Sequence, residues 1–283
     1  MTPAAQAVLH CWSLPLGVNV AIILVAIVYI RGWFRLRSSS PATISAWHLA
    51  SFLLGLLWLW LAIGSPLEAF DDLSILAHMI QHLSLMIAAP PLLLLGAPAM
   101  PLLHGLPERF VRGALGTFLR NGAVQRVGTS ITDPLFCWIT AMIALIAWHI
   151  PAAFELALGS GGWHDVEHIC FFGTSVLFWW PVIQPWPSVS RWPRWSIPLY
   201  LLLGAIAGSA VSAYLCFSER LLYPSYADAP RIWGLAPLAD QEIAGAVMWV
   251  AMTIAFCLPA FLITVRVLSP VRPRQVVAAR VNR

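Results

Sequence analysis

The chain contains 283 residues, of which 60% are hydrophobic and only 10% are charged, against about 25% charged residues in an ordinary soluble domain. A soluble fold has too little interior to bury so much apolar surface, so the composition excludes a soluble enzyme, a secreted mini-protein and a disordered chain. The net charge of +4 comes from 16 arginines and 12 acidic residues, and these arginines lie between apolar runs, which is typical of membrane orientation and not of nucleic-acid binding.

Seven apolar segments are long enough to cross a bilayer as helices. A hydrocarbon core of about 30 Å needs about 20 helical residues, and an open strand would leave backbone groups unpaired in lipid. We therefore predict an all-α polytopic membrane protein, a seven-transmembrane-helix bundle that forms one domain over residues 1–283. The expected spans are approximately 16–34, 45–64, 73–96, 131–150, 163–183, 197–217 and 241–265.

The arginines predict how this bundle is oriented. Cytoplasmic loops carry an excess of basic residues, and only Arg220 and Arg231 fall on the side opposite to the other 14 arginines. We expect the N-terminus outside and the C-terminus in the cytoplasm, with no cleavable signal peptide because the first 15 residues contain no basic segment. The 14 arginines on the predicted cytoplasmic side are Arg31, Arg35, Arg37, Arg109, Arg112, Arg120, Arg126, Arg191, Arg194, Arg266, Arg272, Arg274, Arg280 and Arg283.

Residues 106–127, between the third and fourth predicted spans, are too polar to cross the bilayer. Leu106, Phe110, Ala114 and Phe118 recur every four residues, while arginines occupy the other face. This pattern is typical of an amphipathic helix that lies in the membrane interface. We predict a cytoplasmic interfacial helix here, with a docking surface for a partner as the alternative.

Five of the eight histidines fall in the outer halves of three consecutive predicted spans. They form the H-x-x-x-H pairs His78/His82 and His164/His168, and His149 lies near the outer end of the span between them. Residues i and i+4 share one helix face with β-carbons about 5–6 Å apart, so both imidazoles can bind one ion. Ionisable groups are costly at that depth and therefore indicate a functional site. The remaining histidines, for which we expect no metal role, are His10, His48 and His104.

The seventh predicted span adds two candidate ligands or supporting groups. Asp240 lies at its outer edge, where a carboxylate can orient a metal-bound imidazole. Met248 lies two turns deeper, and its thioether favours Cu(I), whereas a set of imidazoles and carboxylates suits zinc or Cu(II). Gly245 removes bulk where a neighbouring helix can approach. The five cysteines contain no C-x-x-C pair, so we expect neither a thiolate metal site nor a disulfide framework.

Three other interpretations of the histidines stay open. His164 to His168 also fits H-x-x-E-H, in which Glu167 is the general base beside a zinc-bound water; this would make the protein a membrane-embedded zinc metallohydrolase. Histidines on facing helices can also ligate a non-covalently bound haem. In a purely structural scaffold, the imidazoles would only form hydrogen bonds between helices.

Several motifs occur in order over about residues 45–265 and cover six of the seven predicted spans. They are His78-Met-Ile-Gln-His82-Leu, Ala89-Pro90-Pro91 with Gly96-Ala97-Pro98, Trp148-His149-Ile150-Pro151, His164-Asp-Val-Glu167-His168, Phe178-Trp179-Trp180-Pro181, Leu222-Tyr223-Pro224-Ser225-Tyr226, and Asp240-Gln241 through Gly245 to Met248-Trp249. Taken together, they resemble the signature of the CtaG family of caa3-type cytochrome c oxidase assembly factors.

The resemblance implies a multi-pass protein of the bacterial inner membrane that supports metallation of haem–copper oxidase. It implies an assembly factor or metallochaperone and not an enzyme, with copper as the expected cofactor and zinc or haem as alternatives. The expected partners are the lipid bilayer, cytochrome c oxidase subunits and a periplasmic copper donor, with no nucleic acid. The family's recurrent residues correspond here to His78, His82, His149, His164, His168 and Asp240, with Met248 beside them.

Overall fold

The computed structural model describes residues 12, 16–39, 44–185, 192–231 and 233–269. Over these residues the chain is helical and contains no strand. Several residues used above lie outside the described part of the chain, namely His10, Arg191, Arg272, Arg274, Arg280 and Arg283.

Every regular element of the described chain is a helix, as predicted. The long helices are α2 (Leu16–Ser39), α3 (Ala46–Gly64), α11 (Pro134–Trp148), α13 (Gly161–Ile183), α14 (Ser196–Cys216) and α15 (Pro237–Leu268). The shorter segments are α4 (Pro66–Phe70), α5 (Ile75–Leu83), the π-helix η1 (Ser84–Ala88), α6 (Ala89–Leu95), α7 (Ala99–Gly105), α8 (Glu108–Phe110), the π-helix η2 (Val111–Leu115), α9 (Gly116–Arg120), α10 (Gly122–Ile131), α12 (Pro151–Leu158) and the 3₁₀ turn η3 (Pro224–Tyr226).

Six segments of the described chain are long and apolar enough to cross a membrane, which confirms the prediction of an all-helical, multi-span protein. These segments are Leu16–Ser39, Ala46–Phe70, Ile75–Leu95, Gly161–Ile183, Ser196–Cys216 and Pro237–Leu268. The helices α10 and α11 make a seventh only if they act as one span, because they meet at an angle of 61°. The bend has a local cause: Asp133 caps the N–H groups of Leu135 and Phe136, and Pro134 cannot continue α10.

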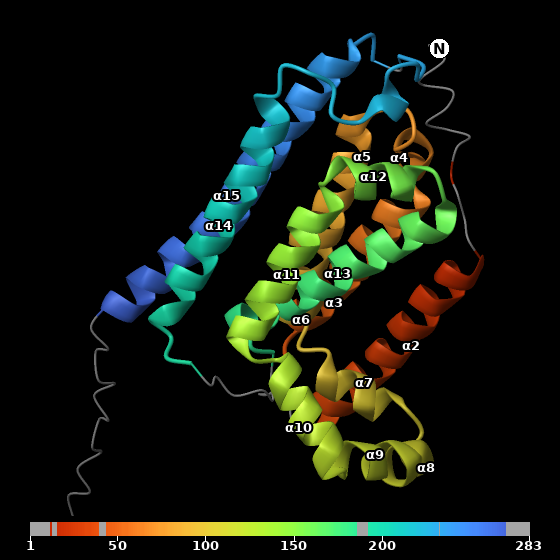
Figure 1. Cartoon of the computed structure of the whole chain (residues 1–283). Helices are drawn as coiled ribbons and strands as arrows, with labels where there is room; N and C mark the ends of the chain where they lie inside the picture. The colour runs from red at the N-terminus through yellow and green to blue at the C-terminus, as the bar shows by residue number, and fades with distance from the viewer. Residues whose placement is uncertain (1–11, 13–15, 40–43, 186–191, 232, 270–283) are drawn as a thin grey trace, which may run out of the picture.

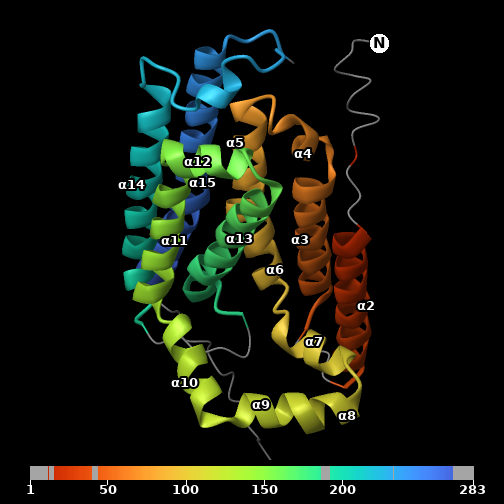
Figure 2. The ribbon, with the colours of Figure 1, turned by 45° about the vertical axis from the view of Figure 1, so that its right-hand side comes forward.

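Several short helices and the loop between α14 and α15 lie at two opposite ends of the bundle. Figure 2 shows α4, α12 and the loop between α14 and α15 at one end, with α7, α8, α9 and α10 at the other. Figure 1 shows α14 and α15 side by side as a hairpin. Gly245 allows this close packing, as predicted, since a β-carbon there would lie 2.7 Å from the backbone nitrogen of Cys216.

Residues 106–127 form a helical path that turns at Asn121. The side chain of Asn121 accepts a hydrogen bond from Ala123 N–H, which begins α10 in a new direction. Phe110 and Phe118 are 51% and 59% exposed, so this segment has apolar side chains that the described protein does not cover. Its place in a membrane interface stays a prediction.

The third membrane segment is interrupted by the π-helix η1, and the sequence explains why. Pro90 and Pro91 have no N–H, so the carbonyl of Met86 loses the donor four residues ahead and the donor five residues ahead. The indole N–H of Trp179 on α13 donates to this carbonyl at 3.0 Å. The proline pair therefore links the third membrane segment to α13.

We expect Trp179→Phe to lower the free energy of unfolding by about 1–3 kcal/mol, because the buried carbonyl of Met86 would lose its donor. The measurement is thermal or denaturant unfolding of the full chain in detergent. The matched control is Trp180→Phe, which removes the same atoms from the neighbouring, less buried ring. An equal effect of the two substitutions would contradict this role of Trp179.

Candidate metal centre

Two helices bring four potential metal ligands together in the interior. His78 and His82 lie one turn apart on α5, and His164 and Glu167 lie three residues apart on α13, so each pair shares one helix face. One nitrogen or oxygen atom from each of the four side chains lies within 4.8 Å of the others. We call these four residues the inner site. His78, His82 and Glu167 are at most 1% exposed.

The distances in the inner site are those expected between ligands of one ion. His78 Nε2 and His82 Nε2 lie 3.6 and 3.7 Å from Glu167 Oε2. Hydrogen bonds of this kind are about 2.7–3.2 Å long, whereas two ligands on a tetrahedral ion with bonds of about 2.1 Å are about 3.4 Å apart. The separations are thus too long for good hydrogen bonds and suit a shared cation.

The polar atoms of this site are also unpaired. Within the described chain, His78 Nε2, both ring nitrogens of His82 and both carboxylate oxygens of Glu167 are buried without a hydrogen-bond partner. Burying so many polar atoms without partners is unfavourable unless another group compensates them. A metal ion bound by these lone pairs would provide that compensation, so the donor set fits a metal.

Tyr226 orients one of the ligands. Its hydroxyl donates to the carbonyl of Asp71 at 2.7 Å, and its oxygen lies 3.4 Å from His78 Nδ1. Burial raises the pKa of Tyr226, so its hydroxyl keeps the proton that it donates. Because that proton points to Asp71, the oxygen is left to accept from His78 Nδ1–H. The lone pair of His78 is then on Nε2, which faces Glu167.

The remaining predicted histidines lie around the inner site. His168 has its ring centroid 4.1 Å from that of His164 and 5.6 Å from that of His82, and its Nε2 is buried and unpaired. His149 donates from Nδ1 to the carbonyl of Leu145 at 2.7 Å, which leaves Nε2 unprotonated. The rings of His149 and His82 both contact Phe171, with centroid distances of 6.0 and 4.5 Å.

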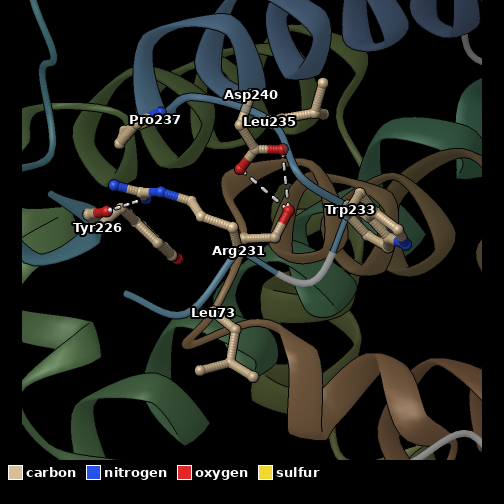
Figure 3. Close-up of a pocket in the computed structure, with 8 residues that line it drawn as sticks. Leu73, Tyr226, Arg231, Trp233, Leu235, Pro237 and Asp240 are labelled. Atoms are coloured by element: carbon tan, nitrogen blue, oxygen red, sulfur yellow. Dashed lines mark hydrogen bonds between the residues drawn. The ribbon is translucent and has the colours of Figure 1, made fainter. Parts of the chain in front are cut away.

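Asp240 contacts the helix that carries two of the ligands and forms no described contact with an imidazole. Its carboxylate accepts a hydrogen bond from Ser74 Oγ at 3.0 Å (Figure 3). It also accepts one from Ile75 N–H at 2.7 Å, at the start of α5. A carboxylate at this end of a helix satisfies free N–H groups and is attracted by the helix dipole. Asp240 therefore positions α5. Met248 is buried in the main hydrophobic cluster, which also includes Met79 and Phe171.

The loop between α14 and α15 is held by hydrogen bonds that its side chains donate to backbone carbonyls. Arg231 donates to the carbonyl of Tyr226 at 3.2 Å (Figure 3) and to that of Ala227 at 2.7 Å. Tyr223 stacks on Phe154 with a centroid distance of 3.9 Å and donates to the carbonyl of His149 at 3.1 Å. These contacts fix the aromatic side chains that cover the imidazoles.

Sequence reasoning missed the carboxylates that lie near the imidazoles, Glu68 among them. Glu167 was expected only as the base of a hydrolase, although its spacing from His164 places both on one helix face. Asp71 was not a candidate, yet its Oδ2 lies 3.3 Å from His164 Nε2. Burial, with smaller contributions from the carboxylates of Asp72 and Glu68, raises the pKa of Asp71 to about 8, so this carboxyl ionises at neutral pH only when a neighbouring cation favours its charged form.

The two histidines expected to have no metal role form local hydrogen bonds. His48 Nδ1 lies 2.9 Å from Ser45 Oγ and 3.1 Å from Ser45 N at the start of α3. His104 Nδ1 lies 2.9 Å from the carbonyl of Met100. Both are at the end of the bundle away from the inner site.

The sequence is similar to two curated proteins, both uncharacterized, from Mycobacterium bovis and Mycobacterium tuberculosis. Each is 24% identical over 263 residues, which cover 87% of this chain and 38% of the relative. The chain therefore spans about two fifths of the length of these relatives. No solved structure matches it.

One family model covers most of the chain, from residue 27 to residue 269, and its description is cytochrome c oxidase caa3 assembly factor. The matched range contains every side chain of the inner site and the helices that position it. The chain belongs to the family of caa3-type cytochrome c oxidase assembly factors, as its motifs indicated.

Proposed function

We propose that this protein binds copper at the inner site and supports metallation of haem–copper oxidase. The observation that carries the proposal is the group of buried, unpaired imidazole nitrogens and carboxylate oxygens, spaced as ligands of one ion. Membership of an oxidase assembly family supports the oxidase as the destination of the metal. Copper is here the cargo of the protein.

The ligand types favour a divalent ion. Three imidazoles and one carboxylate suit Cu(II) or Zn(II), whereas Cu(I) prefers thioether and thiolate ligands. The position of Glu167 beside His78 and His82 supports a ligand role over a general-base role, since its carboxylate is fully buried. The rings of His78 and His82 are 4.2 Å apart and nearly perpendicular, which disfavours a haem between them.

We also propose seven spans, with α10 and α11 acting together as the fourth, the N-terminus outside and the C-terminus in the cytoplasm. The distribution of arginines supports this orientation. The arginine-rich segments lie near the end of the bundle formed by α7, α8, α9 and α10 (Figure 2), and basic residues are concentrated on the cytoplasmic side. The inner site then lies toward the extracytoplasmic face of the inner membrane. Residues 106–127 would lie in the cytoplasmic interface.

Release of copper would occur by ligand exchange with a more exposed acceptor. His168 supports a stepwise exchange, because its ring lies beside His82 and its Nε2 is unpaired, and the unpaired Nε2 of His149 offers a further ligand on the other side of Phe171. The proposed partners are the bilayer, a periplasmic copper donor and an oxidase subunit that receives the ion.

We expect the purified full chain to contain about one copper ion, and we expect His78→Ala or Glu167→Gln to lower its copper affinity by about tenfold or more. Each substitution removes one lone pair from the inner site. Elemental analysis and a competition titration with a copper chelator provide the measurement. His104→Ala is the control, because His104 is exposed and lies at the other end of the bundle.

Unchanged copper content in both inner-site variants would disprove the proposal. Zinc as the only bound metal would favour the hydrolase alternative in which Glu167 is the base. An absorption band typical of haem would favour the haem-binding alternative.

We expect Asp240→Ala to lower copper affinity by about tenfold and stability by about 1–2 kcal/mol, because Ser74 Oγ and the N–H of Ile75 at the start of α5 would lose their acceptor. Copper titration and thermal unfolding of the same samples measure the two effects. Glu242→Ala is the matched control, since Glu242 is an exposed carboxylate on the same helix turn. If Asp240→Ala reduced stability without changing copper affinity, Asp240 would not position the ligands.

A further inference from the structure

A second group of potential ligands adjoins the inner site. Glu68 on α4, Asp71 just after α4, and His164 at the start of α13 each offer one oxygen or nitrogen atom, and these atoms lie within 4.8 Å of one another. We call these three residues the outer group. Figure 2 shows α4 at the end of the bundle where α12 and the loop between α14 and α15 also lie.

The carboxylates of the outer group are held in place. Asp71 Oδ1 accepts from the N–H of Asp72 at 2.6 Å, and Asp71 Oδ2 lies 3.3 Å from His164 Nε2. That second distance again matches the spacing of about 3.4 Å between two ligands on one ion. Glu68 Oε2 accepts from Gln81 Nε2, and the same amide donates to the carbonyl of Ala62 at 3.0 Å. Gln81 lies on α5 between the two inner histidines, so α5 fixes ligands of both groups.

Glu68 makes the outer group the more accessible of the two, since Asp71 is buried and His164 belongs to both groups. The side chain of His164 is 15% exposed and Glu68 is half-buried, whereas His78 and Glu167 are fully buried. His164 is the one residue that belongs to both groups. An ion that binds Glu68, Asp71 and His164 is therefore already attached to a ligand of the inner site.

No arginine competes with a cation for the outer group in the described chain. Among the described residues, the ion-pair partner of Asp71 is His164, and the one arginine–carboxylate pair, Arg112 with Glu108, lies at the opposite end of the bundle. His164 Nε2 is buried and has no hydrogen-bond partner in this part of the chain. A bound cation would pair with this nitrogen and with the carboxylate oxygens, which burial otherwise leaves in an unfavourable environment.

We propose that Glu68, Asp71 and His164 form an outer site that captures a divalent cation and passes it to the inner site, with His164 as the ligand common to both. This inference rests on the proposed function of the inner site. During transfer, the bonds to Glu68 and Asp71 break as bonds to His78, His82 and Glu167 form. The ion keeps its charge and no electron moves, so no other reactant is needed.

The test uses the metal-free full chain in lipid nanodiscs with Cu²⁺ as the ion. At saturation we expect two ions per chain in the wild type: a tight ion at the inner site, which includes His164, and a weak ion held by Glu68 and Asp71. Glu68→Gln and Asp71→Asn, singly and combined, should abolish the weak ion, leave the tight affinity within about threefold, and slow loading of the inner site by about tenfold or more in rapid mixing. The absorption of Cu²⁺ bound to imidazole reports loading.

Asp72→Asn is the matched control, because it removes the same charge from an exposed neighbour of Asp71 that is not in the outer group. It should keep the weak ion and load at nearly the wild-type rate. The inference is wrong if the outer variants retain both ions, or if the control slows loading as much as they do. Should Asp71→Asn not fold, as judged by thermal unfolding, Glu68→Gln provides the same test at a half-buried position.

The two proposals fail in different ways. If the wild type binds no ion that His78→Ala weakens, the proposed function of the inner site is wrong. If the tight ion depends on His78 but loads equally fast in the wild type and the outer variants, the inner site stands and the outer site does not exist.

Discussion

The structure depends on one electrostatic requirement: a carboxylate and several imidazoles are buried together at distances at which they cannot satisfy one another. Glu167 faces His78 and His82 at distances too long for good hydrogen bonds, and the facing atoms have no other partner in the described chain. Such an arrangement is unfavourable in a low-dielectric core unless a cation joins the atoms. The surrounding helices must therefore hold the ligands in place when no ion assists them.

Distant parts of the sequence supply that support. Asp240 on α15 accepts hydrogen bonds from the start of α5, Tyr226 in the preceding loop fixes the tautomer of His78, and Trp179 on α13 replaces a donor lost at a proline pair. Each contact joins elements that are far apart along the chain. The ligands are thus positioned by hydrogen bonds to backbone and side chains that themselves bind no metal, which is the usual way in which a protein orients metal-binding groups.

Periodicity and composition predicted the helical, multi-span class and the two histidine pairs, because both follow from the spacing of residues along one helix. The bend between α10 and α11 was not predicted, although Asp133-Pro134 is a local signal for it. Glu167 and Asp71 were missed as neighbours of the imidazoles, since their approach depends on how α4, α5 and α13 meet. Asp240 was expected to orient an imidazole, yet it acts through a helix end, a distinction that no linear pattern contains.

The π-helix η1 gives the third membrane segment two separate roles. A single π turn adds about one residue to the helical repeat, which rotates everything beyond it by about 100°. Before η1, α5 directs its histidines at α13 and packs against α15; after η1, α6 turns a different stripe of side chains toward α3. Because of this rotation, one set of side chains on the helix carries the metal ligands and a different set packs against the neighbouring membrane helix α3.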